Sequence, residues 1–156
     1  MDLALFEPDI PQNTGTMIRL GACLDIPVHV IEPCGFAFSE KSFRRAGLDY
    51  IELADIRHHA SWRRFEAWRR GEKRRLVLLS AKADAAHTAF SFRASDILMV
   101  GRETSGVPTR VFEACDARIR IPMRAGVRSL NVATAAAMVL GEALRQTKTY
   151  PKRSRT

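Results

Sequence analysis

The chain contains 156 residues, which is enough for one domain that buries most of its apolar surface without disulfides or metals. Hydrophobic residues make up 46% and charged residues 27%, as in ordinary soluble globular proteins, and no apolar run is long enough to span a membrane. The opening residues carry acid rather than base and are too few for a signal peptide, so we expect a cytoplasmic protein without membrane association.

Positive charge dominates the sequence. Lys and Arg number 25 against 17 acidic residues, a formal net charge of +8, and 20 of these bases are arginine. The planar donor fork of arginine suits phosphate, so the surplus indicates a polyanionic partner, although a GC-rich genome that favours arginine codons is an alternative. Four arginines crowd one short stretch, which codon usage alone does not explain, so nucleic acid is the favoured partner. They are Arg118, Arg120, Arg124 and Arg128.

Strands and helices alternate along the chain. The predicted elements are, in order, a strand at 2–6, a helix at about 15–24, a strand at 28–31, a helix at 39–46, a strand at 50–53, a helix at 62–70, strands at 76–79, 96–100 and 117–121, and a helix from 129 to about 146. Gly47 is a good helix stop and Ser61 a good helix cap. The continuously apolar strand at 76–79 is typical of a sheet covered on both faces. The alternation predicts an α/β domain with a mostly parallel sheet flanked by helices.

Two segments in the C-terminal half each combine a strand, a loop of Gly, Pro and polar residues, and the start of a helix. The first spans residues 98–108 and the second residues 119–133. Open α/β sheets bind ligands at such junctions, because loop backbone groups and helix N-termini point into the crevice beyond the strand ends. The two junctions therefore predict one site with a wall from each.

The common signatures of nucleotide, metal and protease sites are missing. No GxGxxG follows the first strand, and Walker A, HExxH and a convincing Ser-His-Asp set are absent. The three cysteines, Cys23, Cys34 and Cys115, form no CxxC pair, which predicts reduced thiols and no zinc site. His58 and His59 stand in an exposed-looking stretch before a helix, so we expect solvated histidines rather than metal ligands.

Small residues crowd the first half of the last predicted helix, at 132–139. Burial of this helix in the chain's own core accounts for most of the composition. Packing against a second copy of the chain is the sharper interpretation, because small side chains let another backbone approach closely. A homodimer also offers more area for gripping a large RNA than 156 residues do alone.

Three short motifs follow one another along the chain. They read Pro11-Gln12-Asn13-Thr14-Gly15 followed by Arg19, then Gly101-Arg102-Glu103-Thr104-Ser105-Gly106-Val107-Pro108, then Ile121-Pro122-Met123 with Ser129-Leu130-Asn131. With these motifs in this order, the chain resembles the SPOUT-class methyltransferases, the family with a C-terminal trefoil knot. The match extends from Leu5 to about Gln146. Glu32-Pro33, Gly35-Phe36 and residues 45–50 make it most similar to the small tRNA 2′-O-methyltransferases that act on wobble nucleotide 34 (the TrmL or YibK type).

The resemblance implies a particular form of α/β fold, with a deep C-terminal trefoil knot. It implies a single SPOUT domain over residues 1–156, with the knot at approximately 76–146 and a basic tail at 147–156. Periodicity could not have indicated a knot, which general topology rules disfavour. The resemblance also implies a homodimer that completes each active site from two subunits.

By resemblance, the methyl donor is S-adenosylmethionine, bound bent inside the knot and released as S-adenosylhomocysteine, with no metal. Its binding positions carry over to Leu79, Gly101, Ile121 and Ser129, with Leu130 as a neighbour. Gly101 lets the backbone come close to the ligand, and Leu79 and Ile121 offer apolar walls to adenine. Taken alone, Leu79 and Ile121 fit an ordinary core equally well.

The family's catalytic positions carry over to Arg19, Glu103, Ser129 and Asn131. A guanidinium hardly deprotonates, so we expect Arg19 to bind the phosphate beside the target and to polarise the 2′-hydroxyl rather than to act as the base. Glu103 suits a structural pair with an arginine equally well. Asn131 stands at a helix start, where capping competes with catalysis.

The implied activity is 2′-O-methylation of nucleotide 34, a cytidine or a modified uridine, in the tRNA anticodon stem-loop. Two alternatives keep the same motifs: a ribose methyltransferase of another tRNA or rRNA site, and a non-catalytic RNA-binding protein. Neither the tRNA isoacceptors nor the choice between C34 and U34 follows from the sequence. One departure is Gly141, where relatives often have Tyr, which puts an aromatic contact at that point in question.

Overall fold

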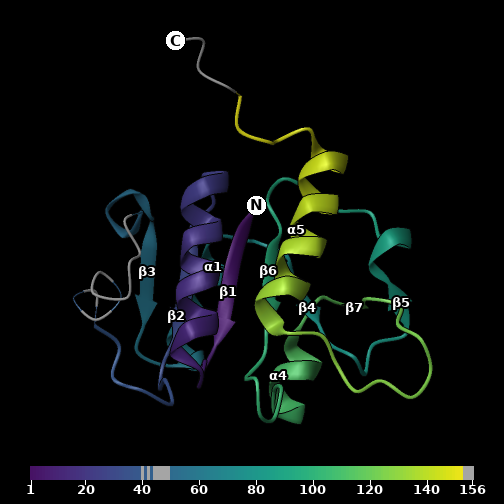
Figure 1. Cartoon of the computed structure of the whole chain (residues 1–156), viewed down its shortest axis with the longest axis horizontal. Helices are drawn as coiled ribbons and strands as arrows, with labels where there is room; N and C mark the ends of the chain where they lie inside the picture. Colours follow the sequence, from purple (N-terminus) through teal and green to yellow (C-terminus); the bar gives the residue numbers. More distant parts are fainter. Residues whose placement is uncertain (40, 42, 44–49, 153–156) are drawn as a thin grey trace.

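The computed structural model describes residues 1–39, 41, 43 and 50–152 (Figure 1). Seven strands form one sheet in the order β3-β2-β1-β6-β4-β7-β5, and every adjacent pair runs parallel. The strands are β1 (Asp2–Phe6), β2 (Val28–Ile31), β3 (Ile56–His59), β4 (Leu76–Leu79), β5 (Ala85–Ala86), β6 (Ile97–Val100) and β7 (Ala117–Arg120). The parallel α/β sheet predicted from the alternation of elements is confirmed.

The first strand of the chain lies in the middle of the sheet. Leu3 of β1 is in register with Val28 of β2 on one side and with Leu98 of β6 on the other. Because all strands point the same way, their carboxyl ends meet at one edge, the lower edge in Figure 1. Loops that leave this edge are brought together although they are far apart in the sequence.

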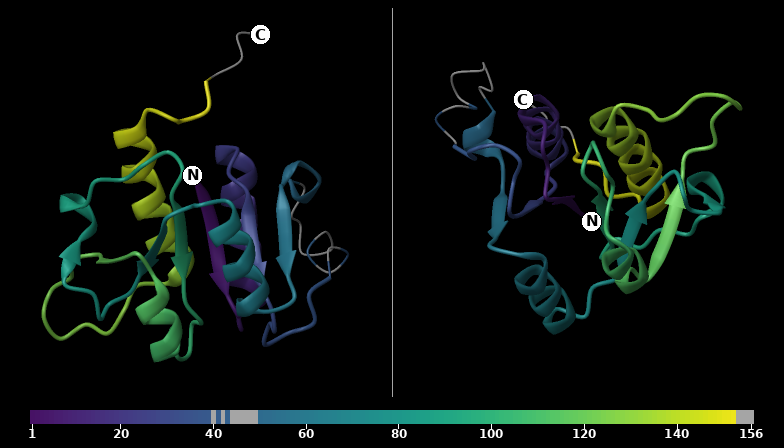
Figure 2. Two further views of the ribbon diagram at one scale, coloured as in Figure 1. Left: turned by 180° about the vertical axis from the view of Figure 1, so that it is seen from behind. Right: turned by 90° about the horizontal axis from the view of Figure 1, so that it is seen from below.

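Helices cover both faces of the sheet. Helices α1 (Pro11–Leu24) and α5 (Val132–Thr147) lie side by side on one face, and α3 (Trp62–Gly71) and α4 (Thr109–Ala114) lie on the other (Figure 2). Successive residues of a strand point to opposite faces, so β1 contributes to two apolar cores. Leu3 and Leu5 pack in the core beneath α1 and α5, and Ala4 and Phe6 pack in the core beneath α3 and α4.

Most predicted elements agree with the structure to within a few residues. The strands at 2–6, 28–31 and 76–79 have the predicted bounds. Helix α1 begins at Pro11, four residues earlier than predicted, because proline suits the first turn of a helix. Ser61 caps α3 as predicted, its Oγ accepting a hydrogen bond from the Arg64 N–H at 3.2 Å. The helix predicted at 39–46 lies almost wholly outside the described residues.

One predicted element is wrong in type, and others differ in their bounds or were missed. Residues 50–53 are not a strand: Ile51–Leu53 form a short 3₁₀ helix, η1, in which Ile51 is buried and Leu53 is 73% exposed. The strand that joins the sheet is β3, an edge strand whose exposed polar side chains conceal its role in the sequence. The last helix begins at Val132 rather than 129, because the side chain of Asn131 caps it. Sequence reasoning also missed β5 and the 3₁₀ helix η2 (His87–Ala89).

The histidine pair divides between solvent and core. His58 is exposed, as predicted, with its Nδ1 3.3 Å from Glu32 Oε1. His59 is instead half-buried, and its Nε2 lies 2.9 Å from Nδ1 of His29, whose Nε2 is 3.0 Å from Asp2 Oδ2. Burial, followed by the neighbouring positive groups, lowers the pKa of His59 to about 4. Across the described residues, no helix has the length and apolar character that crossing a membrane requires.

Candidate functional site

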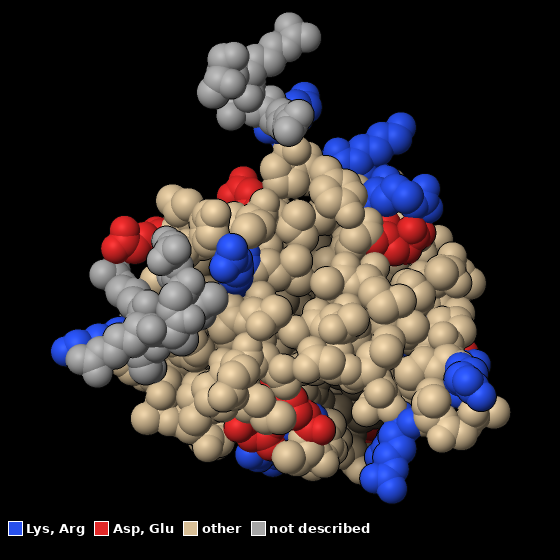
Figure 3. Space-filling view, viewed as in Figure 1, with Lys and Arg blue, Asp and Glu red and all other residues tan. Residues whose placement is uncertain are grey.

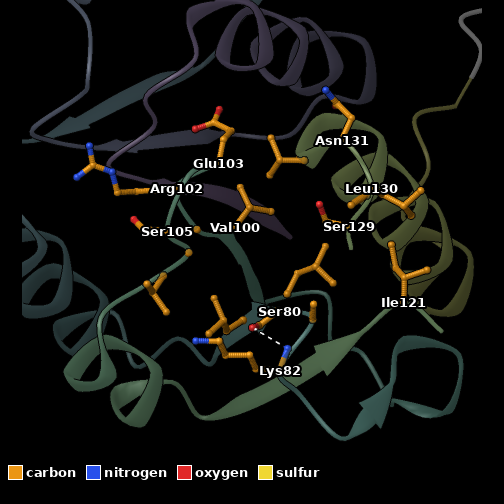
Figure 4. A pocket seen from close by; sticks show the side chains of 18 of the residues that line it. Ser80, Lys82, Val100, Arg102, Glu103, Ser105, Ile121, Ser129, Leu130 and Asn131 are labelled. Atoms are coloured by element: carbon orange, nitrogen blue, oxygen red, sulfur yellow. Dashed lines mark hydrogen bonds between the residues drawn. The ribbon is translucent and has the colours of Figure 1, made fainter. Parts of the chain in front are cut away.

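A cavity of about 520 Å³ opens at the carboxyl ends of β4 and β6 (Figure 4). Its walls come from both predicted junctions, the loop after β6 and the loop between β7 and α5, so the two do form one site. The lining contains seven of the eight predicted site residues: Leu79, Gly101, Glu103, Ile121, Ser129, Leu130 and Asn131. The geometry can enclose a small molecule between apolar walls with polar groups at the rim.

The apolar part of the cavity comes from strand ends. Leu79 ends β4, Val100 ends β6, and Ile121 directly follows β7. Ser129, Leu130 and Asn131 lie together on the wall beside α5, opposite Arg102 and Ser105 (Figure 4). Leu130 keeps 39% of its surface exposed, which leaves an apolar side chain available to a ligand.

Gly101 is required by the loop that follows it. The backbones of Arg102 and Gly106 exchange two N–H···O bonds of 2.9 Å, which close a tight turn. A Cβ added at Gly101 would lie 2.7 Å from the carbonyl carbon of Gly106, closer than real Cβ contacts allow. Gly106 itself has φ +68°, a left-handed conformation that favours glycine. The structure therefore shows a close approach between Gly101 and Gly106 at the other end of the same loop.

Glu103 is held by the first motif and the residues just before it, rather than by an arginine. Its Oε2 accepts a hydrogen bond from the Asp9 N–H at 2.9 Å, and its Oε1 accepts one from Asn13 Nδ2 at 3.3 Å. Burial and the neighbouring Asp9 carboxyl raise the pKa of Glu103. Arg102 pairs with Glu7 and Asp9, and within the described residues no arginine pairs with Glu103. The alternative of an arginine partner for Glu103 does not hold in this part of the chain.

Asn131 joins two motifs while it caps α5. Its Oδ1 accepts hydrogen bonds from the N–H groups of Ala133 and Thr134, at 2.9 and 3.2 Å. Its Nδ2 donates to Oδ1 of Asn13 at 2.9 Å. Because Asn13 also donates to Glu103, one chain of hydrogen bonds connects the three motifs at the rim of the cavity. Asn131 therefore has the capping role that sequence reasoning left open, and its amide faces the first motif.

Arg19 is the predicted residue that the cavity does not include. It is exposed on α1, and its guanidinium lies 4.7 Å from the centre of the Tyr50 ring. Its position on the face shared by α1 and α5 keeps it outside the cavity of its own subunit. A guanidinium stacked in this way still offers its edge to an anion.

The four clustered arginines have different environments. The guanidinium of Arg118 is hydrogen-bonded at the end of α4, where its Nε donates to the Phe112 carbonyl at 2.7 Å. Arg120 reaches the carbonyl of Asp84 at 3.3 Å. Arg124 and Arg128 are exposed in the loop between β7 and α5, beside the cavity. The predicted basic loop thus retains two exposed arginines.

Sequence reasoning missed one wall of the site. Ser80 and Lys82 line the cavity directly after β4, and the Lys82 N–H donates to Ser80 Oγ at 3.2 Å (Figure 4). Their position after a continuously apolar strand was the available signal, since the ends of parallel strands share an edge. Ile10, in the loop after β1, and Met123, in the loop after β7, also line the cavity. Among the described residues, no group of three or more His, Cys, Asp or Glu could hold a metal ion.

Comparisons with known proteins agree along almost the whole chain. The model of the SpoU rRNA Methylase family matches residues 1–141. A curated relative from Ancylobacter novellus, named tRNA (cytidine(34)-2′-O)-methyltransferase, is 56% identical over 145 residues, which cover 93% of this chain and 92% of the relative. A solved structure described as giving structural insights into the 2-OH methylation of C/U34 on tRNA has a TM-score of 0.84 at 41% identity, covering 93% of this chain and 94% of that one. The SpoU methyltransferase AviRb from Streptomyces viridochromogenes, in complex with the cofactor AdoMet, has a TM-score of 0.84 at 26% identity, covering 94% of this chain and 57% of that one.

Proposed function

The chain belongs to the SpoU rRNA methylase family, as its motifs predict, and on that basis we propose that it methylates the 2′-hydroxyl of nucleotide 34 in tRNA. The observation that carries the proposal is the 56% identity, over 93% of the chain, to a relative named for this reaction. The methyl group passes from S-adenosylmethionine to the 2′-oxygen, the hydroxyl proton is lost, and S-adenosylhomocysteine remains. The target is a cytidine or a modified uridine in the anticodon loop.

The cavity suits the donor in size and in lining. A volume of about 520 Å³ is within the range of cavities that hold small ligands. Leu79, Ile121 and Leu130 provide apolar surface for adenine, and Ser129 provides a hydroxyl. The bound donor supplies the sulfonium methyl. The protein's contribution is to hold that methyl in line with the 2′-oxygen, since alignment of reactants supplies much of a transfer rate.

The four proposed catalytic residues divide into two groups. Glu103, Ser129 and Asn131 line the cavity, where they can orient the ribose beside the donor. Arg19 is outside it, on the exposed side of α1. We assign Arg19 the phosphate next to the target and polarisation of the 2′-hydroxyl, because an arginine keeps its proton at neutral pH. This division suits a site that is completed by two subunits.

A homodimer through α1 and α5 would bring the two groups together. The outward face of α5 carries Thr134, Ala137 and Met138, and Met138 is 45% exposed. Figure 3 shows that the surface over α1 and α5 is nearly free of charged side chains. An uncharged face with small side chains suits close packing against a second copy, which would set Arg19 of one protomer near the cavity of the other.

Gly141 lies on the same helix, α5, and the side chain of Tyr150 lies beside it. The Tyr150 hydroxyl donates to the Gly141 carbonyl at 3.1 Å, and an added Cβ at Gly141 would lie 3.2 Å from that hydroxyl. An aromatic side chain is therefore present beside position 141, although it comes from the residues after α5.

We further propose that the chain is a single domain, that the family's knot lies at residues 76–146, and that the protein acts in the cytoplasm, where its tRNA substrate is found.

The direct test compares tRNA transcripts that differ only at nucleotide 34. We expect methyl incorporation into a transcript with C34 and none into the same transcript with a 2′-deoxyribose at position 34. Incorporation that persists in the deoxy transcript would move the target to another tRNA position, and incorporation confined to rRNA would replace tRNA as the substrate. A chain that bound tRNA but no S-adenosylmethionine in calorimetry would be a non-catalytic RNA-binding protein.

A further inference from the structure

A second hollow, of about 500 Å³, lies on the opposite edge of the sheet from the donor cavity. Its residues come from the C-terminal turn of α3 and from the segments that precede β4, β6 and β7, so they surround the amino ends of the strands. Six basic residues and one acid, Asp116, account for nearly all of the lining. The basic residues are Arg69, Arg70, Lys73, Arg74, Arg75 and Arg93.

Three of these arginines form a rigid floor. The Nη1 of Arg69 donates to Asp116 Oδ2 at 2.8 Å and to the Arg74 carbonyl at 2.7 Å. Arg74 pairs with Asp2, and Arg75 forms a two-pronged contact with Asp96 at 2.8 and 2.6 Å. Paired guanidinium groups of this kind stabilise the fold and leave little charge for a ligand.

The rim of the hollow carries two cations without an acidic partner and a third that is only partly paired. Lys73 and Arg93 are exposed, and neither side chain forms an ion pair or hydrogen bond within the described part of the chain. Arg70 has a side chain that is 70% exposed and uses only its Nε, at 2.7 Å from Glu66, which leaves its two terminal nitrogens available. The backbone at Lys73 is held in a tight turn by hydrogen bonds from Lys73 N–H to Arg70 and from Arg74 N–H to Arg69, at 3.1 and 3.2 Å. The turn therefore fixes where Lys73 leaves the backbone, and the rim keeps N–H donors available to an anion.

We propose that this hollow is a second RNA-binding surface, which holds backbone phosphates of the tRNA away from nucleotide 34. The inference rests on the proposed function for the choice of RNA. Guanidinium and ammonium groups at the rim suit phosphate oxygens, whereas the lining has no aromatic ring on which a base could stack. Contacts of this type add affinity without reading sequence.

The position of the hollow determines which part of the RNA can reach it. A strand of five residues such as β1 is about 16 Å long at about 3.3 Å per residue, so the two edges are at least that far apart. An RNA whose nucleotide 34 lies at the mouth of the donor cavity must extend at least this far along the subunit to reach the hollow. The phosphates held there belong to a more distant part of a full-length tRNA. The C-terminal end of α5, which Lys148 caps, points toward the same edge of the sheet (Figure 1).

The test is the double variant Lys73→Gln with Arg93→Gln in the full chain. Both side chains are exposed and unpaired, so the variant should keep the wild-type melting temperature. We expect its affinity for full-length tRNA, measured without donor, to fall by about five- to tenfold, and the slope of log K against log salt to shrink by about two. Affinity for the isolated anticodon stem-loop and for S-adenosylmethionine should stay unchanged.

A matched control removes the same charge from the other end of α3, with Arg63→Gln and Arg64→Gln. An equal loss in this control would show a general charge effect and overturn the proposal, as would an unchanged affinity and salt slope in the hollow variant. An equal loss for the stem-loop would overturn the assignment to a distant part of the tRNA. A variant that kept tRNA affinity but lost binding to phosphatidylserine vesicles would assign the hollow to a membrane surface instead. Because RNA binding is measured without methyl transfer, failure of the proposed reaction would be seen separately.

Discussion

Gly101 offers the sharpest test of the donor cavity, because one added methyl group should disturb one loop. In Gly101→Ala the new Cβ would lie 2.7, 2.9 and 3.0 Å from three backbone atoms of Gly106. Ordinary contact begins at about 3.4 Å, so the Gly106 segment must move by about 0.7 Å. The two 2.9 Å bonds between Arg102 and Gly106 would then approach 3.6 Å, where they no longer count as hydrogen bonds.

The size of the effect follows from those two bonds. Each contributes about 0.5–1.5 kcal/mol, so the closed loop loses about 1–3 kcal/mol relative to open arrangements. If the donor binds the closed loop, its affinity should fall by about 5- to 150-fold, since 1.4 kcal/mol corresponds to a factor of ten. The larger Gly101→Val should abolish measurable binding. Both variants should keep the folded core, because residues 101–106 belong to neither of the two apolar clusters.

Calorimetric titration with S-adenosylmethionine measures this loss. The matched control is Gly71→Ala at the end of α3, where an added Cβ meets nothing within 4 Å and donor affinity should be that of the wild type. If Gly101→Ala also bound the donor as tightly as the wild type, the inferred coupling between loop closure and the donor cavity would be wrong.

Four further outcomes follow from the site and the fold. Arg19→Ala should lose methyl transfer yet keep donor affinity within about twofold. Arg19→Lys should restore little activity, because a point charge does not reproduce the donor fork of a guanidinium. Lost donor affinity in calorimetry would contradict the assignment of Arg19 to the RNA phosphate. Met138→Arg should dissociate the proposed dimer in sedimentation and abolish transfer, whereas an active monomer would remove the need for a second subunit. Asn131→Ala should lower the unfolding free energy by about 1 kcal/mol through the lost cap, measured by urea titration, and an unchanged value would mean that the cap contributes nothing. The pKa of His59 is about 4 in the folded chain, below the ordinary 6.5, so between these two values the unfolded chain binds a proton that the folded chain does not. The free energy of unfolding should therefore fall as the pH drops from 6.5 to 4. His59→Gln should flatten this pH dependence in urea titrations, and an equal slope in the variant would assign the dependence to other groups.

Local patterns predicted the parts of the fold that local forces decide. The central strands are largely apolar because both faces of the sheet are covered, and the predicted bounds were correct for β1, β2 and β4. The edge strand β3 was not predicted, because it is partly exposed to solvent and therefore tolerates the polar residues Arg57 and His58. The apolar Ile51 and Leu53 suggested a strand, yet only one of them is buried.

The candidate site was predicted as a region but not as a set of contacts. The two junctions indicated where a ligand would bind, since parallel strands end at a common edge. The bonds from Asn13 to Glu103 and to Asn131 span 90 and 118 residues of sequence, so no periodicity could reveal them. The knot and the roles of Arg19 and Ser129 came from the family resemblance alone. They remain proposals, because residue types and spacing do not determine chain threading or catalysis.

The central place of β1 has a consequence for synthesis of the chain. The ribosome delivers β1 before the other strands of the sheet, and its partner β2 follows within about 25 residues, but its other neighbour, β6, begins at Ile97. At about 5–20 residues per second, roughly 3 to 13 seconds separate the arrival of β2 from that of β6. During that interval the edge of a strand with five buried side chains has no hydrogen-bonding partner on one side. The nascent chain should therefore be most vulnerable to aggregation, and most dependent on chaperones, while residues of about 35–95 are being added.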